Sequence, residues 1–244
     1  MSMSSSLRVK TETGNLDLAI LSEIFGRVPY GRVILALYDP DSQFNPLMVN
    51  VAASHLKSGR DLLYLSSSRP TGEIRQQFND LGVNVAEYEA KDNAVLFDDY
   101  STQMGMKSPE KYHSTSTNLN ERSIVIGQSA PQWPPGTLVI IESFSSMAIN
   151  EENVFAKFAR KATGVWRARG TVMIIGLATD IQTSQFYHEM KLLCDGVFEV
   201  RLIEHHAEMI DTIRSRSMKG QRSDTRWRQI LFDNKMRASL QFLK

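Results

Sequence analysis

The chain has 244 residues, of which 42% are hydrophobic, and its 28 basic and 27 acidic residues give a formal net charge of +1. This length and apolar content suit one domain with a sizeable core, and the balanced charge excludes bulk electrostatics as a means of binding nucleic acid. The single cysteine, Cys194, excludes an internal disulfide, and no apolar run approaches the roughly 18–20 residues that cross a bilayer.

The first twelve residues, MSMSSSLRVKTE, contain no apolar signal-peptide core. We expect residues 1–12 to be a flexible N-terminus and residues 13–244 to form a single domain. Together with the lone cysteine, this predicts a cytoplasmic protein that does not contact a membrane.

Apolar runs typical of strands alternate with helical patterns in the first half of the chain. Buried strands are predicted at Arg32–Tyr38, Asp61–Ser67 and Ala94–Tyr100. Helices are predicted between them, at residues 46–59 and 71–82. Asn45 is placed to cap the first of these helices and Pro46 suits its first position, while Gly82 is a stop signal for the second. The polar residues 101–121 are expected to form a mobile loop.

The second half continues this alternation and then changes. Strands are predicted at residues 137–143 and 170–179, and helices at residues 150–164 and 184–196. Asn150 and Ser184 are the expected caps, and Gly164 is the expected end of the first helix. Three strand-like runs without helices close the chain, at residues 196–204, 209–218 and 227–233. The pattern predicts an α/β fold with a doubly wound, mainly parallel central sheet, helices on both faces and an antiparallel C-terminal strand extension.

The opening segment TGNLDLAILSEIFGRVPYGRVILALYDPDSQFN resembles the KaiC-like or RadA-like branch of the RecA-fold ATPase superfamily. Near the places of that family's leucine-rich segment and G-x-P-x-G turn lie Gly14, Leu18, Leu21, Pro29 and Gly31. Later segments resemble successive family elements in the same order, among them DLLYLSSSRPTGEI, TLVIIESFSSM and RSMKGQRSDTRWRQILFD. The resemblance implies a RecA-like fold, ATP and Mg²⁺ as the family's ligands, and assembly into oligomers.

The family's phosphate loop, G-x-x-x-x-G-K-[ST], aligns with the octet YDPDSQFN, residues 38–45. The glycine amides of that loop wrap a phosphate, its lysine reaches the outer phosphates and its hydroxyl holds Mg²⁺. Here Tyr38 and Gln43 stand at the glycine positions, Phe44 at the lysine position and Asn45 at the hydroxyl position. The octet thus resembles a degenerate Walker A motif, and the chain resembles an inactive paralogue.

Two interpretations of this octet remain. In one, Asp41, Ser42, Gln43 and Asn45 hydrogen-bond a small polar ligand. In the other, which we favour, the octet is a structural turn with Phe44 packed inside. A negative charge such as that of Asp41 would oppose a polyphosphate in this loop.

Two further family positions are altered. The family's water-activating glutamates align with Ser68 and Arg69, and neither is a competent base at neutral pH. The Walker B acid aligns with Glu142, which Ser143 follows. We expect Glu142 to be a solvated carboxylate at a strand end, with a metal or water ligand as the alternative. We therefore expect no catalytic residue, no metal site and no cofactor, with ATP and Mg²⁺ binding as the alternative.

The segment RSRSMKGQRSDTRWRQ interleaves cations with an aromatic residue. Its candidate binding residues are Arg214, Arg216, Lys219, Arg222, Arg226, Trp227 and Arg228. Such a segment can bind nucleic acid, or it can form a subunit interface, where Arg and Trp are favoured. The resemblance places this region at the neighbouring subunit of a ring, so we favour the interface.

These observations predict a non-catalytic pseudo-ATPase that acts as a regulatory or scaffolding subunit. Its partner would be a second copy of the chain or an active paralogue of the same family. One alternative is a nucleic-acid-binding accessory factor of the RadA-paralogue kind, in recombination or repair. The other is an ATPase or sensor with a weak or altered nucleotide site.

Overall fold

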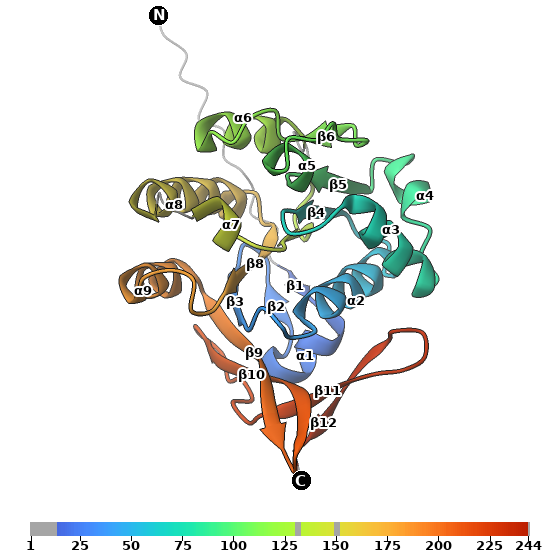
Figure 1. The fold of residues 1–244 in the computed structure, drawn as a ribbon, viewed down its shortest axis with the longest axis vertical. Helices are drawn as coiled ribbons and strands as arrows, with labels where there is room; N and C mark the ends of the chain where they lie inside the picture. The colour runs from blue at the N-terminus through green and yellow to red at the C-terminus, as the bar shows by residue number, and fades with distance from the viewer. Residues whose placement is uncertain (1–13, 130–132, 149–151, 244) are drawn as a thin grey trace, which may run out of the picture.

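The computed structural model describes residues 14–129, 133–148 and 152–243. The expected flexible N-terminus and the expected cap Asn150 lie outside these residues. A large twisted sheet runs through the molecule, with helices on both of its faces and the C-terminal strands at one end (Figure 1). In the described part of the chain, no helix is both long enough and apolar enough to cross a membrane.

The main sheet has the strand order β12-β11-β10-β9-β3-β8-β7-β4-β5-β6. Its parallel part consists of β3 (Val33–Tyr38), β4 (Leu62–Ser66), β5 (Ala94–Asp98), β6 (Tyr112–His113), β7 (Leu138–Ile141), β8 (Val172–Ala178) and β9 (Gly196–His205). The antiparallel extension consists of β10 (Glu208–Met218), β11 (Arg228–Phe232) and β12 (Ala238–Phe242). A separate antiparallel pair is formed by β1 (Asn15–Leu16) and β2 (Val28–Pro29).

Helices cover both faces because the central strands are apolar on both sides. In β3, Val33, Leu35 and Leu37 face one core, and the residues between them face the other. One core is closed by η1 (Ala19–Leu21), α1 (Ser22–Phe25), α2 (Phe44–Lys57), α3 (Thr71–Asp80) and α4 (Val85–Glu89). The other is closed by α6 (Leu119–Ser129), α7 (Ser145–Ala148), α8 (Glu152–Ala168) and α9 (Ser184–Leu193). The predicted fold class is confirmed.

Several local predictions are wrong. The expected mobile loop contains α5 (Tyr100–Gln103), β6 and the start of α6. Helix α8 continues past Gly164, because Phe155, Ala159 and Trp166 keep its apolar stripe against the core. The cap of α9 is not Ser184 but Thr183, whose hydroxyl accepts a hydrogen bond from the backbone of Phe186 at 3.3 Å.

Candidate functional site

The carboxyl ends of β3, β4 and β7 bring three of the predicted groups to one edge of the sheet. The octet follows β3, Ser68 and Arg69 follow β4, and Glu142 and Ser143 follow β7. Ligands of open α/β sheets bind at this edge. Direct contacts join two of the groups, since the Ser68 hydroxyl donates to Glu142 Oε2 at 2.8 Å.

Glu142 is fully buried, with 0% of its surface exposed. Arg69 Nε donates to its Oε1 at 2.7 Å, forming an ion pair, and the Tyr64 hydroxyl donates to the same oxygen at 3.1 Å. Ser68 and Ser66 donate to Oε2 at 2.8 and 3.4 Å. The expectation of a solvated carboxylate is therefore wrong, because burial of this strand end gives Glu142 an internal cation and three hydroxyl partners in place of water.

The surroundings of Glu142 keep Arg69 charged and Tyr64 neutral. Burial opposes the charge of Arg69, but the neighbouring Tyr64 and Glu142 outweigh it and raise the pKa of the guanidinium. Burial also raises the pKa of Tyr64, and the charge of Glu142 adds to that shift. Arg69 Nη1 donates to Gln77 of α3 at 2.8 Å, whereas its Nη2 is buried without a partner among the described residues. The guanidinium is thus fixed at the carboxylate.

Phe44, at the position that the family's lysine would take, is part of the core. Its side chain is buried, and its ring stacks on Tyr38 with centroids 4.1 Å apart. A Cβ atom on Gly176 of β8 would lie 2.9 Å from the Phe44 ring and 2.1 Å from the Glu142 carbonyl oxygen. Burial raises the pKa of Tyr38 to about 12, so its hydroxyl remains neutral. The packed interior of a structural turn accounts for both aromatic residues.

The amino end of α2 is capped from outside the octet. The helix begins at Phe44, so Asn45 lies in its first turn, and the prediction of Asn45 as N-cap is wrong. The backbone N–H of Gln43 donates to Asp211 Oδ1 of β10 at 2.7 Å. The carboxylate of Asp211, on a strand distant in sequence, therefore takes the place of a local capping side chain.

Asp39, the first acidic residue of the octet, anchors it to β9 and to the residue that follows β8. Asp39 accepts hydrogen bonds from Arg201 Nη1 at 2.6 Å and from the Thr179 hydroxyl at 2.8 Å. Its carbonyl oxygen accepts from the backbone and hydroxyl of Ser42. Asp41 is exposed and Ser42 half-buried. The octet is thus fixed by its own chain at several points.

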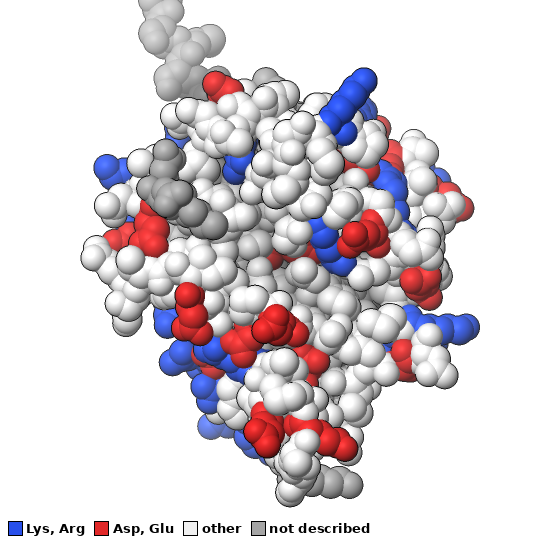
Figure 2. All heavy atoms as spheres, in the orientation of Figure 1, with Lys and Arg blue, Asp and Glu red and all other residues white. Residues whose placement is uncertain are grey.

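The first part of the basic segment surrounds a buried acid. Glu199 of β9 accepts from Arg214 at 2.7 Å and from Arg216 at 3.0 Å, and Arg201 lies 3.6 Å away. Arg214 also lies over the ring of Trp227, 4.4 Å from its centroid. Basic side chains gather along the lower left edge of the molecule beside β9 and β10, with acidic side chains among them (Figure 2).

The second part of the basic segment is also paired within the chain. Arg226 and Arg228 both bind Asp224, at 2.9 and 2.6 Å, and Arg228 also binds Glu23 at 3.1 Å. Lys219 Nζ donates to two carbonyl oxygens at the end of α9, the nearer one at 2.6 Å. Arg222 is exposed and contacts no charged partner in the part of the chain that is described.

Sequence reasoning missed the residues that complete these clusters. Tyr64, Gln77, Glu199 and Asp211 each lie in an element whose apolar pattern indicates only packing. Glu199 carried a signal, since it interrupts the apolar strand GVFEVRL and a buried acid requires a cation. Among the described residues, no three His, Cys, Asp or Glu side chains group as metal ligands would.

Comparison with known proteins agrees with the fold described above. The structure of a KaiC-like protein from the hyperthermophilic archaeon Pyrococcus horikoshii OT3 matches with a TM-score of 0.71 and 13% identity, covering 96% of this chain and 100% of that chain. At that identity the match shows the fold, which is RecA-like. No match was found among curated proteins. The family model of the ATPase KaiC matches residues 12–234. Since this match spans most of the sequence, the chain belongs to the KaiC family of ATPase domains.

Proposed function

We propose that this chain is a non-catalytic KaiC-family protein, a pseudo-ATPase that acts as a regulatory or scaffolding subunit. It assembles with itself or with an active paralogue. The observation that carries this proposal is the occupied carboxylate of Glu142, which Arg69 Nε contacts at 2.7 Å inside a fully buried site. In the family, the acid at this place orients Mg²⁺.

The ion pair and the metal compete for one carboxylate. Mg²⁺ could reach Glu142 only after the Arg69 guanidinium moved away and lost its carboxylate partner. The guanidinium would also lose its contact with Gln77. A metal–nucleotide complex would have to overcome this cost before gaining any affinity.

The octet supports the same proposal. Phe44 offers no positive charge to a phosphate, and its ring fills the space beside Gly176 and Tyr38. Turning Phe44 out to admit a phosphate would expose an aromatic side chain and leave a cavity, at a cost of about 3–5 kcal/mol if the truncation of such residues is a guide. The lysine position thus carries a buried aromatic side chain, and the carboxylate at the metal position is engaged by an arginine of the chain itself.

Calorimetric titration with ATP and MgCl₂ tests this proposal. We expect no Mg²⁺-dependent saturable heat at nucleotide concentrations up to about 1 mM, the weak end of specific binding, and no release of phosphate. An active KaiC-family ATPase titrated under the same conditions is the positive control. Saturable, Mg²⁺-dependent binding with phosphate release would instead establish the alternative of an altered ATPase or sensor.

The pairing of the basic segment favours an interface over nucleic acid. Glu199 and Asp224 hold four of its arginines in ion pairs within the chain, so these guanidinium groups would have to give up internal contacts before they displaced counterions from a phosphate backbone. We expect no binding to single- or double-stranded DNA in fluorescence anisotropy at low salt. Affinity that falls steeply with added salt would support the accessory-factor alternative and contradict the interface.

A further inference from the structure

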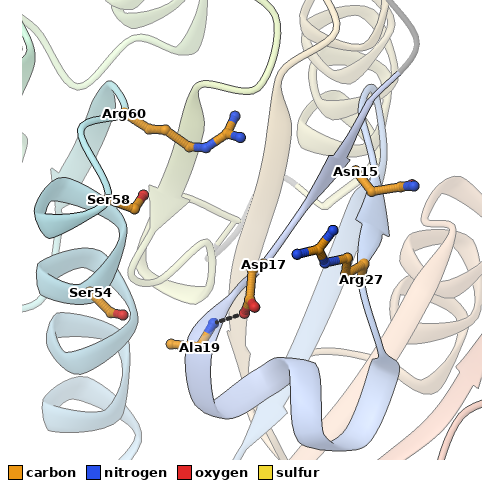
Figure 3. A pocket seen from close by; sticks show the side chains of 7 residues that line it. All are labelled: Asn15, Asp17, Ala19, Arg27, Ser54, Ser58 and Arg60. Carbon is orange, nitrogen blue, oxygen red and sulfur yellow. Dashed lines mark hydrogen bonds between the residues drawn. The ribbon is translucent and has the colours of Figure 1, made fainter.

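A groove of about 500 Å³ lies between α2 and the N-terminal segment that contains β1 and η1. It is lined by Asn15, Asp17, Ala19, Arg27, Ser54, Ser58 and Arg60 (Figure 3). Arg60 precedes β4, whereas Ser68 and Arg69 follow it, so the groove lies at the opposite end of the parallel strands from the Glu142 cluster. It is therefore separate from the family's nucleotide site.

Two arginines enter the groove from opposite walls. Arg60 extends from the α2 side and Arg27 from the side of the N-terminal segment, and their guanidinium groups point toward the space between them (Figure 3). Arg27 is exposed and has no hydrogen-bond or ion-pair partner among the residues described. Its guanidinium is thus available to an outside anion.

Arg60 is held in position before any ligand arrives. Its Nη1 donates to the Tyr30 hydroxyl at 2.7 Å. The Tyr30 ring fits between two glycines, because a Cβ atom would come within 2.5 Å of it at Gly14 and within 2.7 Å at Gly136. A fixed ring fixes the guanidinium, and a pre-oriented donor loses less entropy on binding.

The one carboxylate in the described lining of the groove, that of Asp17, forms no ion pair with Arg27 or Arg60. The Asp17 carboxylate accepts from the backbone of Ala19 at 2.9 Å and is turned toward it (Figure 3). Carbonyl oxygens at the end of α2 accept from the Ser58 backbone, the Ser58 hydroxyl and the Gly59 backbone. The groove therefore presents two guanidinium groups and one carboxylate, and Ala19 is the one apolar residue among the described residues of its lining.

We propose that this groove binds a small molecule that carries a phosphate or diphosphate group. Two forks of donors from opposite walls suit the tetrahedral oxygens of a phosphate better than the coplanar oxygens of a carboxylate. Ser54 and Asn15 supply further polar groups at the rim. The volume lies within the range of small-molecule sites, and an adjoining hollow that shares Ala19 and Ser54 adds the exposed Arg237.

Titration with sodium pyrophosphate in the absence of Mg²⁺ tests the proposal. We expect saturable heat and a higher melting temperature, with sodium chloride at the same ionic strength as the reference. The Arg27→Gln and Arg60→Gln variants should each bind at least about tenfold more weakly, the loss expected for one charge-assisted contact. Arg160→Gln is the matched control, because this exposed arginine lies on α8, on the other face of the sheet.

Three outcomes would overturn the proposal. The first is that pyrophosphate does not bind at about 10 mM, beyond the weak end of the affinity scale. The second is that pyrophosphate binding survives in both Arg27→Gln and Arg60→Gln. The third is that a single-stranded oligonucleotide binds and pyrophosphate does not. Near-ultraviolet circular dichroism checks that the variants fold. If Arg60→Gln does not fold, Arg60→Lys replaces it as a variant that keeps the charge but loses the forked donor. ATP binding that disappears in Arg27→Gln belongs to the groove, and it leaves the proposal of a blocked nucleotide site intact.

Discussion

A buried guanidinium and carboxylate both lose their hydration, and their attraction repays that loss only when the geometry is good. Arg69 and Glu142 meet at 2.7 Å, but Arg69 Nη2 has no partner among the described residues. The pair is therefore weak support for stability as a whole. Each charge nevertheless depends on the other, because the carboxylate is fully buried and the guanidinium is nearly so.

Removing one charge of this pair should cost more than removing both. We expect Arg69→Met to lower the free energy of unfolding by about 3–5 kcal/mol, because Glu142 stays buried without a cation. The double variant with Glu142→Leu should recover most of this loss. Urea denaturation of the wild type, both single variants and the double variant measures the coupling. Equal losses in the Arg69→Met and double variants would contradict the role assigned to the pair.

His55 makes the stability of the fold depend on pH. Its side chain is buried in α2 and its Nε2 lies 2.9 Å from the carbonyl oxygen of Asp61, while burial lowers its pKa to about 4. The unfolded chain thus takes up a proton more readily than the folded protein. This contribution is fully present above the ordinary histidine pKa of about 6.5 and is lost as the pH falls from there toward 4.

We expect the free energy of unfolding to fall by about 2 kcal/mol between pH 7 and pH 5 on account of His55. Urea denaturation at the two pH values measures this. His55→Gln should reduce the pH dependence by that amount, whereas His188→Gln, at an exposed position on α9, should leave it unchanged. An unaltered pH dependence in His55→Gln would show that His55 does not cause it.

At the scale of the elements, two glycines show how far the end of a helix can be predicted from the sequence. Gly82 and Gly164 both carry the sequence signal for the end of a helix. Gly82 follows α3 with φ +71°, whereas Gly164 lies inside α8. A Cβ atom added at either position would meet nothing within 4 Å. Local sequence does not distinguish the two glycines, because the packing of α8 decides the outcome.

These two glycines should respond to alanine in opposite ways. Gly164→Ala should stabilise the protein by about 0.5–1 kcal/mol, because alanine loses less backbone entropy in a helix. Gly82→Ala should destabilise it by about 1–2 kcal/mol, since an L-residue is strained at positive φ. Thermal unfolding of both variants measures these changes, and a gain in stability for Gly82→Ala would contradict the assignment.

The parallel strands were predictable because their apolar runs are long and continuous, as in β3 and β8. The exposed hairpin strand β12 was not, because its alternation is short and polar. At the candidate site, the order of family segments placed Ser68, Arg69 and Glu142 near one another. Their contacts could not be predicted, because a carboxylate at a strand end is equally compatible with solvent and with an internal cation.

On the scale of the whole molecule, the two proposed binding surfaces lie apart from the Glu142 cluster. The basic segment lies on the antiparallel extension, which continues the sheet beyond β9. The arginine-lined groove lies at the amino ends of the parallel strands. A protein that assembles through one surface could bind a small anion at another without using the nucleotide position.

Light scattering tests assembly directly. We expect the measured mass to exceed that of one chain, either for the protein alone or after mixing with an ATP-binding KaiC-family protein. Arg222→Glu should weaken this association, because Arg222 is the exposed arginine of the basic segment that no described acid neutralises. Arg160→Glu, with the same change of charge on α8, should not weaken it.

Since Arg222 supports no described contact within the fold, the melting temperature of Arg222→Glu should equal that of the wild type, which separates a lost interface from a damaged subunit. A strict monomer in both experiments would contradict the scaffolding role.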